Sequence, residues 1–181
     1  MSQNESFLEM SHLGPPPRWM RCPRKGSIVA DKFIPFKVPL KEFYDSQVPD
    51  ECRFYPEMIF TSIKAQKKKV SLIMRVSQFI SPLLKIFDLD FFHVNFQIGL
   101  WVDLTNTDRY YDKNIIEDNE CKYLKLACKG RGECPSEEVV QTFITVVDQF
   151  ISKNPLSLVG IHCTHGFNRT GFLIGENLEK F

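Results

Sequence analysis

The sequence predicts an α/β fold in which helices flank a central, mostly parallel sheet. Three features indicate it. An apolar run at 98–104 ends in polar residues, apolar positions recur at helical spacing over 139–151, and a second apolar run at 156–162 leads into a loop and a helix start. Helix, strand, loop and helix in this order are typical of parallel sheets. A length of 181 residues suits one such domain.

The first strand is predicted at 98–104 as a buried strand. Its carboxyl end carries Asp103, and functional groups gather at that end of parallel strands. Residues 123–128 alternate weakly between apolar and polar and predict another strand. The glycine-rich segment 129–135 that follows is predicted as a loop.

The long helix has start and stop signals at its two ends. Ser136 is a favourable cap, and Glu137 and Glu138 suit the positive end of the helix dipole. Asn154-Pro155 stops the helix. The strand at 156–162 follows, so this part of the chain predicts one helix packed on the sheet.

The amino-terminal third has fewer signals. Residues 1–17 are polar and end in three prolines, which predicts a flexible tail. Residues 18–56 are rich in turn formers and are predicted as irregular chain wrapped on the core. We therefore expect the domain itself to span 18–181.

Composition excludes several classes of protein. Hydrophobic residues make up 43% of the chain, which excludes global disorder, and a net charge of +1 means that any RNA-binding basic site must be local. The six cysteines lack Cys-x₂-Cys spacing, so no metal site and no cofactor are predicted. The start of the chain does not resemble a signal peptide, which predicts free thiols. Polar residues interrupt the apolar run at 70–92, so no membrane span is expected.

The segment 162–171, His-Cys-Thr-His-Gly-Phe-Asn-Arg-Thr-Gly, has the residues needed to transfer phosphate to a thiol. Cys163 lies between an apolar strand and a helix start, where backbone N–H groups favour the thiolate over a thiol of ordinary pKa, about 8.5. Either a lone cysteine or a lone arginine would be ordinary structure. The joint spacing of Cys163, Gly166, Arg169 and Thr170 favours a phosphate-binding loop instead.

Each of these residues has a predicted role. Gly166 permits a tight bend, and the backbone from Thr164 to Arg169 can curl into an anion-binding nest. The planar fork of Arg169 can hold two phosphate oxygens, and the Thr170 hydroxyl can donate to the sulfur.

This segment resembles the signature loop of the cysteine-dependent phosphatases. Further segments are similar to the RNA 5′-triphosphatase domain of the metazoan mRNA capping enzyme: Pro17-Arg18-Trp19 with Cys22-Pro23, Tyr44-Asp45-Ser46-Gln47, Asp103-Leu104-Thr105-Asn106-Thr107 with Tyr110-Tyr111, and Gly130-Arg131-Gly132-Glu133-Cys134-Pro135. The resemblance implies removal of the γ-phosphate of nascent RNA, the first step of mRNA capping, through a phosphocysteine and without a metal. By matching position it implies the catalytic residues Cys163, Arg169, Thr170 and Asp103, and the phosphate-binding loop Thr164, His165, Gly166, Phe167, Asn168 and Arg169.

Two roles stay open at this point, those of Asp103 and His165. Asp103 either donates a proton or orients Arg169 or the loop; a diphosphate leaving group, with a last pKa of roughly 6, needs little help. His162 is expected to fix the loop, whereas His165 either faces the substrate or does not. Tyr110 and Tyr111 are expected to pack.

The resemblance also implies partners and a location. The 5′-triphosphate end of RNA is the expected substrate, with RNA polymerase II machinery as a further partner, a nuclear location and no membrane. Basic residues that can track an RNA backbone, or simply form a solvated surface, are Lys67-Lys68-Lys69, Arg18, Arg21, Arg24, Lys25, Lys129 and Arg131.

The chain departs from the family pattern at two places. Residues 70–97 have no counterpart, and their terminal Val-Ser and Phe-Gln can be encoded by intron boundary sequences, so a translated intron and a genuine insertion are both considered. After Ile174 the expected apolar helices do not follow, which predicts a fold that is incomplete at the C-terminus. Two other functions stay open: a dual-specificity protein phosphatase, and an inactive fragment that binds RNA or polymerase.

Overall fold

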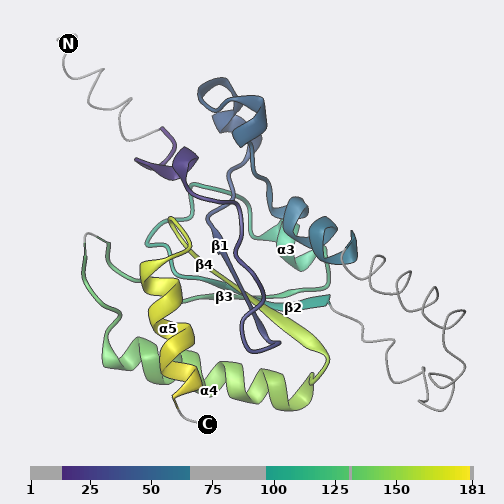
Figure 1. Ribbon diagram of the computed structural model, residues 1–181, viewed down its shortest axis with the longest axis vertical. Coiled ribbons are helices and arrows are strands. Elements are labelled where there is room, and N and C mark those ends of the chain that lie inside the picture. The colour runs from purple at the N-terminus through teal and green to yellow at the C-terminus, as the bar shows by residue number, and fades with distance from the viewer. Residues whose placement is uncertain (1–13, 66–96, 131, 180–181) are drawn as a thin grey trace, which may run out of the picture.

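The computed structural model describes residues 14–65, 97–130 and 132–179 (Figure 1). The predicted insertion at 70–97 lies outside these ranges except for Gln97, and so do Lys67-Lys68-Lys69, Arg131 and residues 1–13 of the predicted tail. Within the described ranges, no helix combines the length and the apolar character needed to cross a membrane.

The core of the fold is one sheet of four parallel strands in the order β1-β4-β2-β3. The strands are β1 (Phe33–Lys37), β2 (Gln97–Asp103), β3 (Lys122–Lys125) and β4 (Ser157–Cys163). Three of them lie at or near the predicted positions, and the predicted α/β fold is confirmed. The strand predicted at 123–128 is shorter than expected, because the chain leaves the sheet after Lys125.

The prediction of irregular chain over 18–56 was wrong at β1. This strand pairs with β4 along one edge of the sheet, with Phe33 beside Val159 and Lys37 beside Cys163. Pro35 interrupts its apolar sequence, and proline is tolerated there because an edge strand needs ladder hydrogen bonds on one side only. The rest of that segment holds three short 3₁₀ helices: η1 (Trp19–Arg21), η2 (Glu42–Gln47) and η3 (Asp50–Cys52).

Helices cover both faces of the sheet (Figure 1). On one face lie α4 (Glu137–Lys153) and α5 (Asn168–Leu178), and their apolar side chains, Leu173 among them, form a core with Leu100 and Val159 of the sheet. The Ser136 hydroxyl accepts the backbone N–H of Val139, as the predicted cap requires. The other face packs against α3 (Asn114–Glu117), the helical residues 56–65 and the 3₁₀ helices, and Phe36 and Trp101 lie in its core.

This topology places the functional loop in the middle of the carboxyl edge. Because all four strands are parallel, their carboxyl ends lie at the same edge of the sheet. The strand β4 lies between β1 and β2, so the loop that follows it is flanked by the chain that follows those two strands. Crevices at this edge are where open α/β sheets bind ligands.

Candidate active site

Cys163 is the last residue of β4, and its side chain is 3% exposed. The chain then turns through Gly166, whose φ of 79° lies in the left-handed region. A side chain there would place its Cβ 2.6 Å from the Phe36 carbonyl carbon, so the loop lies directly on the end of β1. Glycine is therefore required at this position both for its backbone conformation and for close packing.

The environment of Cys163 favours the thiolate. Burial raises the pKa of the thiol, but the hydroxyl of Thr170 and the backbone N–H groups of Thr170, His165 and Gly166 lower it, and the net pKa lies below the ordinary value. The thiol also lies just ahead of the amino terminus of α5, where the helix dipole favours an anion. An anionic sulfur in a ring of N–H donors is the arrangement that nucleophilic attack on phosphorus requires.

Arg169 is held in place by carbonyl groups from two neighbouring loops. One terminal nitrogen donates to Leu104 O at 3.0 Å and to Cys128 O at 2.9 Å, and the other donates to Thr164 Oγ1 at 3.0 Å. A guanidinium carries five N–H donors, so these contacts leave two for a ligand. The guanidinium is thus fixed by residues that follow β2, β3 and β4, and two of its N–H groups remain available to a ligand.

The Thr170 hydroxyl is buried, and it has no hydrogen-bond partner among the described residues. Leaving a buried hydroxyl unpaired is unfavourable, and a charged sulfur or a bound phosphate oxygen would relieve that cost. The position agrees with its effect on Cys163, since the Thr170 hydroxyl is the strongest of the groups that lower the pKa of this thiol.

The two histidines of the loop both make structural contacts. His165 Nε2 lies 2.7 Å from the carbonyl oxygen of Pro17, which can only accept, so this nitrogen carries a proton. The contact ties the loop to the amino-terminal segment, in which Pro16 is buried and Pro17 is exposed. The ring of His162 is completely buried, and its Nε2 lies 2.7 Å from Tyr111 Oη.

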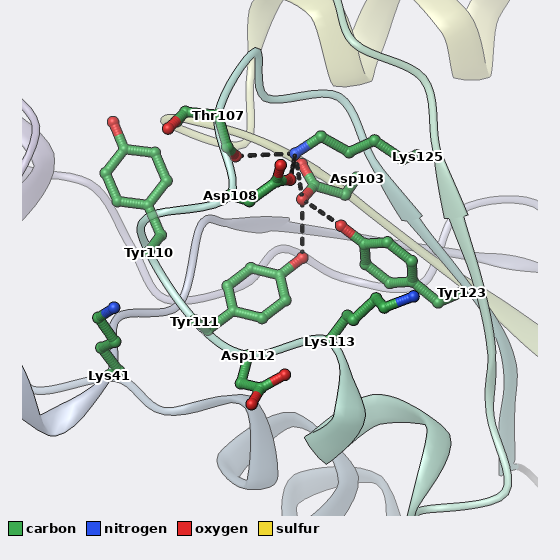
Figure 2. A pocket seen from close by; sticks show the side chains of 10 residues that line it. All are labelled: Lys41, Asp103, Thr107, Asp108, Tyr110, Tyr111, Asp112, Lys113, Tyr123 and Lys125. Carbon is green, nitrogen blue, oxygen red and sulfur yellow. Dashed lines mark hydrogen bonds and ion pairs between the residues drawn. The ribbon is translucent and has the colours of Figure 1, made fainter.

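Asp103, at the end of β2, is the centre of a hydrogen-bond network (Figure 2). Thr105 donates to Oδ1 from both its backbone N–H and its hydroxyl, each at 2.7 Å. Oδ2 has three more neighbours: Tyr123 Oη at 2.8 Å, Lys125 Nζ at 2.9 Å and Tyr111 Oη at 3.0 Å. The carboxylate therefore has a partner for every available lone pair.

These contacts keep Asp103 ionised. Burial would raise the pKa of its carboxyl group, but the ring of His162, the hydrogen bonds from Thr105 and the charge of Lys125 lower it to about 2. Burial also lowers the pKa of His162, so that ring is neutral near pH 7. Because a neutral ring carries no positive charge, Thr105 and Lys125 are the groups that stabilise the carboxylate at this pH. At neutral pH Asp103 holds no proton to donate.

Sequence analysis missed the partners of Asp103. Lys125 and Tyr123 lie in β3, and Thr105 lies two residues beyond Asp103. One signal in the sequence could have indicated this network. Lys125 lies in the strand predicted at 123–128, and a lysine there can pair with an aspartate at the end of a neighbouring strand. Tyr110 and Tyr111 are each 7% exposed, which confirms that they pack, although Tyr111 also contributes its hydroxyl to the network.

The remaining predicted residues lie on the surface around the loop. Phe167 is 52% exposed and Asn168 begins α5. Arg24 donates to Glu51 O. Of the basic residues predicted to track RNA, Arg18, Arg21, Arg24 and Lys129 are exposed and Lys25 is half-buried. No group of three or more metal-ligating side chains converges within the described part of the chain. All six cysteine thiols are free, as predicted.

Known proteins resemble this chain over most of its length. The mRNA-capping enzyme of Danio rerio is 46% identical over 165 residues, which are 91% of this chain and 23% of the relative. The RNA/RNP complex-1-interacting phosphatase homolog of Caenorhabditis elegans is 38% identical over 164 residues, which are 88% of this chain and 58% of the relative. Over about nine-tenths of its length this chain is therefore similar to mRNA-capping enzymes and to an RNA/RNP complex-1-interacting phosphatase homolog.

The predicted family resemblance is therefore confirmed. The mRNA-capping enzyme of Mus musculus is also similar, at 46% identity over 88% of the chain. No family model matches the chain. The chain spans less than a quarter of the length of these capping enzymes, at 23% and 22%. A thiol loop at the end of β4 in an α/β fold agrees with the phosphatase names among the relatives.

Proposed function

We propose that this domain removes the γ-phosphate from the 5′-triphosphate end of RNA, the first step of mRNA capping. The observation that carries the proposal is the loop after β4. There the Cys163 thiol, whose pKa is lowered, and the guanidinium of Arg169, which is fixed by hydrogen bonds, both lie near the amino terminus of α5. The capping-enzyme names of the relatives favour RNA as the molecule that bears the phosphate.

The reaction proceeds in two displacement steps. The Cys163 thiolate attacks the γ-phosphorus, an S–P bond forms, and the bond from phosphorus to the bridging oxygen breaks, so that the electron pair leaves with the RNA 5′-diphosphate. Water then attacks the phosphocysteine and releases inorganic phosphate and a proton, which regenerates the thiolate. The loop N–H groups and the two unspent donors of Arg169 stabilise the charge on the phosphoryl oxygens in both steps.

Asp103 has a positioning role in this proposal. Its pKa of about 2 leaves it ionised, so it is not a proton donor at neutral pH. It contacts the ring of His162, 3.7 Å from Oδ1 to Nε2, and His162 directly precedes the nucleophile. A diphosphate leaving group, with a last pKa of roughly 6, departs without an acid, whereas a serine or threonine alkoxide does not. The ionised state of Asp103 thus favours a triphosphate over a phosphoserine substrate.

Phosphate release in the presence of EDTA tests the proposal. The chain is incubated with γ-labelled 5′-triphosphate RNA beside Cys163→Ser, and both proteins are compared by circular dichroism. We expect release by the native chain and a loss of at least about 10⁴-fold in Cys163→Ser, because a covalent route without its nucleophile falls back on binding alone. Equal release by both proteins would exclude the thiol mechanism.

A phosphoserine peptide serves as the competing substrate. The proposal predicts a higher kcat/KM for triphosphate RNA than for the peptide. A preference for the peptide would instead identify the domain as a protein phosphatase that uses the same loop. A folded protein inactive on both substrates would favour the role of an RNA- or polymerase-binding fragment. RNA polymerase II machinery as a partner and a nuclear location remain part of the proposal.

A further inference from the structure

A second feature of the carboxyl edge is a cavity of about 710 Å³ beside β2 and β3. Its walls come from the chain between Asp103 and Lys113, from β3 and from Lys41 (Figure 2). Small-molecule sites usually occupy 300–1,000 Å³, so the cavity has room for a ligand of nucleotide size. Cys163 is not among its lining residues, so the cavity is separate from the thiol site.

The cavity and the phosphate loop share one segment of chain. Asp103 lines the cavity, and the next residue, Leu104, gives its carbonyl oxygen to Arg169. The strands β4, β2 and β3 are neighbours in that order, and neighbouring strands lie about 4.8 Å apart, so the cavity begins roughly 5–10 Å from the loop along the edge. A ligand that extends from the phosphate loop over the end of β2 therefore enters the cavity.

The charges of the cavity do not favour a phosphate group on its floor. Three lysines and three aspartates line it, and the formal charges cancel. Lys125 is already bound to Asp103, Thr105, Thr107 and Asp108, which occupies its donors. The part of the cavity around Asp103 and Lys125 is thus polar and without net charge, and its charged groups are already paired. It suits a neutral group such as a nucleoside more than a second phosphate.

Two lysines at the rim differ from Lys125. Lys41 is exposed and forms no ion pair within the described part of the chain. The Lys113 side chain is 60% exposed, and its one ion pair within the described ranges is a weak, exposed pair with Glu117 at 4.0 Å. Tyr123 is half-buried, and its aromatic ring lines the cavity on the side of Lys113, whereas Lys41 lies on the opposite side (Figure 2). Aromatic rings and flexible cations are the groups by which proteins bind single-stranded RNA.

We infer that this cavity is a subsite for the first nucleotides of the RNA chain, with the nucleoside on Tyr123 and the next phosphodiester at Lys113. The inference rests on the proposed function, because the γ-phosphate must occupy the loop at Cys163 for the RNA chain to cross β2. In a 5′-triphosphate end, the β- and α-phosphates separate the γ-phosphate from the nucleoside. With the γ-phosphate in the loop, these two groups span the offset between the loop and the cavity. The subsite selects RNA 5′ ends over phosphate compounds that lack a nucleoside.

Two substrates separate the subsite from the thiol site. Inorganic tripolyphosphate fills only the loop, whereas a short 5′-triphosphate RNA fills the loop and the cavity. For Lys113→Ala we expect kcat/KM on RNA to fall about tenfold and on tripolyphosphate by less than about twofold, because one phosphodiester contact is lost. Lys153→Ala, at the end of α4 toward the amino edge of the sheet, is the matched control, and its RNA activity should not fall.

Equal losses on both substrates in Lys113→Ala, or no loss on RNA, would overturn the subsite while leaving the triphosphatase intact. If the native chain hydrolyses neither substrate, the proposed function has failed, and binding of RNA 5′-diphosphate measured by fluorescence anisotropy then decides the inference alone. Weaker binding in Lys113→Ala than in Lys153→Ala supports it, and equal binding contradicts it.

Discussion

Two polar clusters at the carboxyl edge of the sheet differ in how much of their hydrogen-bonding capacity is used. In the thiol cluster of Cys163, Arg169 and Thr170, two N–H groups of the guanidinium and the buried Thr170 hydroxyl have no partner among the residues that the structure describes. In the cluster around Asp103, by contrast, both carboxylate oxygens already accept hydrogen bonds, so no acceptor site of the carboxylate is left for a ligand.

The difference distinguishes the proposed reactive site from the residues that hold it in place. Unspent donors beside a nucleophile are available to an incoming anion, and they cost stability until it arrives. A saturated buried network offers nothing to a ligand, but it holds the neighbouring strands and His162 in one arrangement. Substitutions in the first cluster should therefore change the rate, and substitutions in the second should change the stability.

Arg169→Lys should have the largest effect in the thiol cluster. Lysine keeps the charge but loses the planar fork that binds two carbonyl groups and a phosphate at once, so we expect kcat on triphosphate RNA to fall about 10²- to 10³-fold. Thermal unfolding recorded beside the native chain serves as the control for folding. A loss below about threefold would show that the two unspent donors do not act on the substrate.

Asp103→Asn should mainly affect stability. Because the pKa of Asp103 is depressed to about 2 in the folded state, its contribution is present above the unfolded value of about 3.9 and is lost as the pH falls through 2. We expect the free energy of unfolding at pH 7 to fall by about 2–3 kcal/mol, with a smaller difference near pH 3. Urea unfolding at both pH values measures it.

Asp108→Asn is the matched control for this carboxylate. Asp108 also pairs with Lys125, at 3.1 Å, but its side chain is 89% exposed, so its loss should cost less than about 1 kcal/mol. Equal destabilisation by the two variants would contradict a special role for the buried network. A loss of activity in Asp103→Asn much larger than its loss of stability explains would assign Asp103 to the chemistry.

Thr170→Val should have the smallest effect, of about tenfold on kcat/KM below neutral pH. The substitution removes the hydroxyl that lowers the pKa of Cys163, so that pKa rises and the acid limb of the pH–rate profile moves to higher pH. Thr170→Ser keeps the hydroxyl and should retain the native profile. The rate of Cys163 alkylation as a function of pH measures the thiol directly, and identical profiles in the Val and Ser variants would contradict this role.

The sequence predicted the loop at Cys163 better than the hydrogen-bond network around Asp103, and the reason is physical. The residues from Cys163 to Thr170 are contiguous, so spacing alone reveals a thiol, a bend, a fork and a hydroxyl that act together. The Asp103 network also includes Lys125, 22 positions away, and His162, 59 positions away, and these residues come together only when β2, β3 and β4 pair.

The fold shows the same contrast. The cap at Ser136 and the apolar repeat of α4 are local signals, and both were predicted correctly. The edge strand β1 was missed because Pro35 and the surrounding turn formers indicate loop, whereas pairing with β4 decides its conformation. The tie between His165 and Pro17 likewise depends on contact across 148 positions, for which no local pattern exists.

Trapping the covalent intermediate tests the central claim most directly, namely that Cys163 takes the γ-phosphate from RNA. The protein is mixed with γ-labelled 5′-triphosphate RNA, quenched during turnover under conditions that preserve thiophosphates, digested and analysed by mass spectrometry. The account predicts label on the peptide that contains Cys163, and none when the label is at the α-phosphate. Turnover without labelled protein, or label on a different residue, would contradict it.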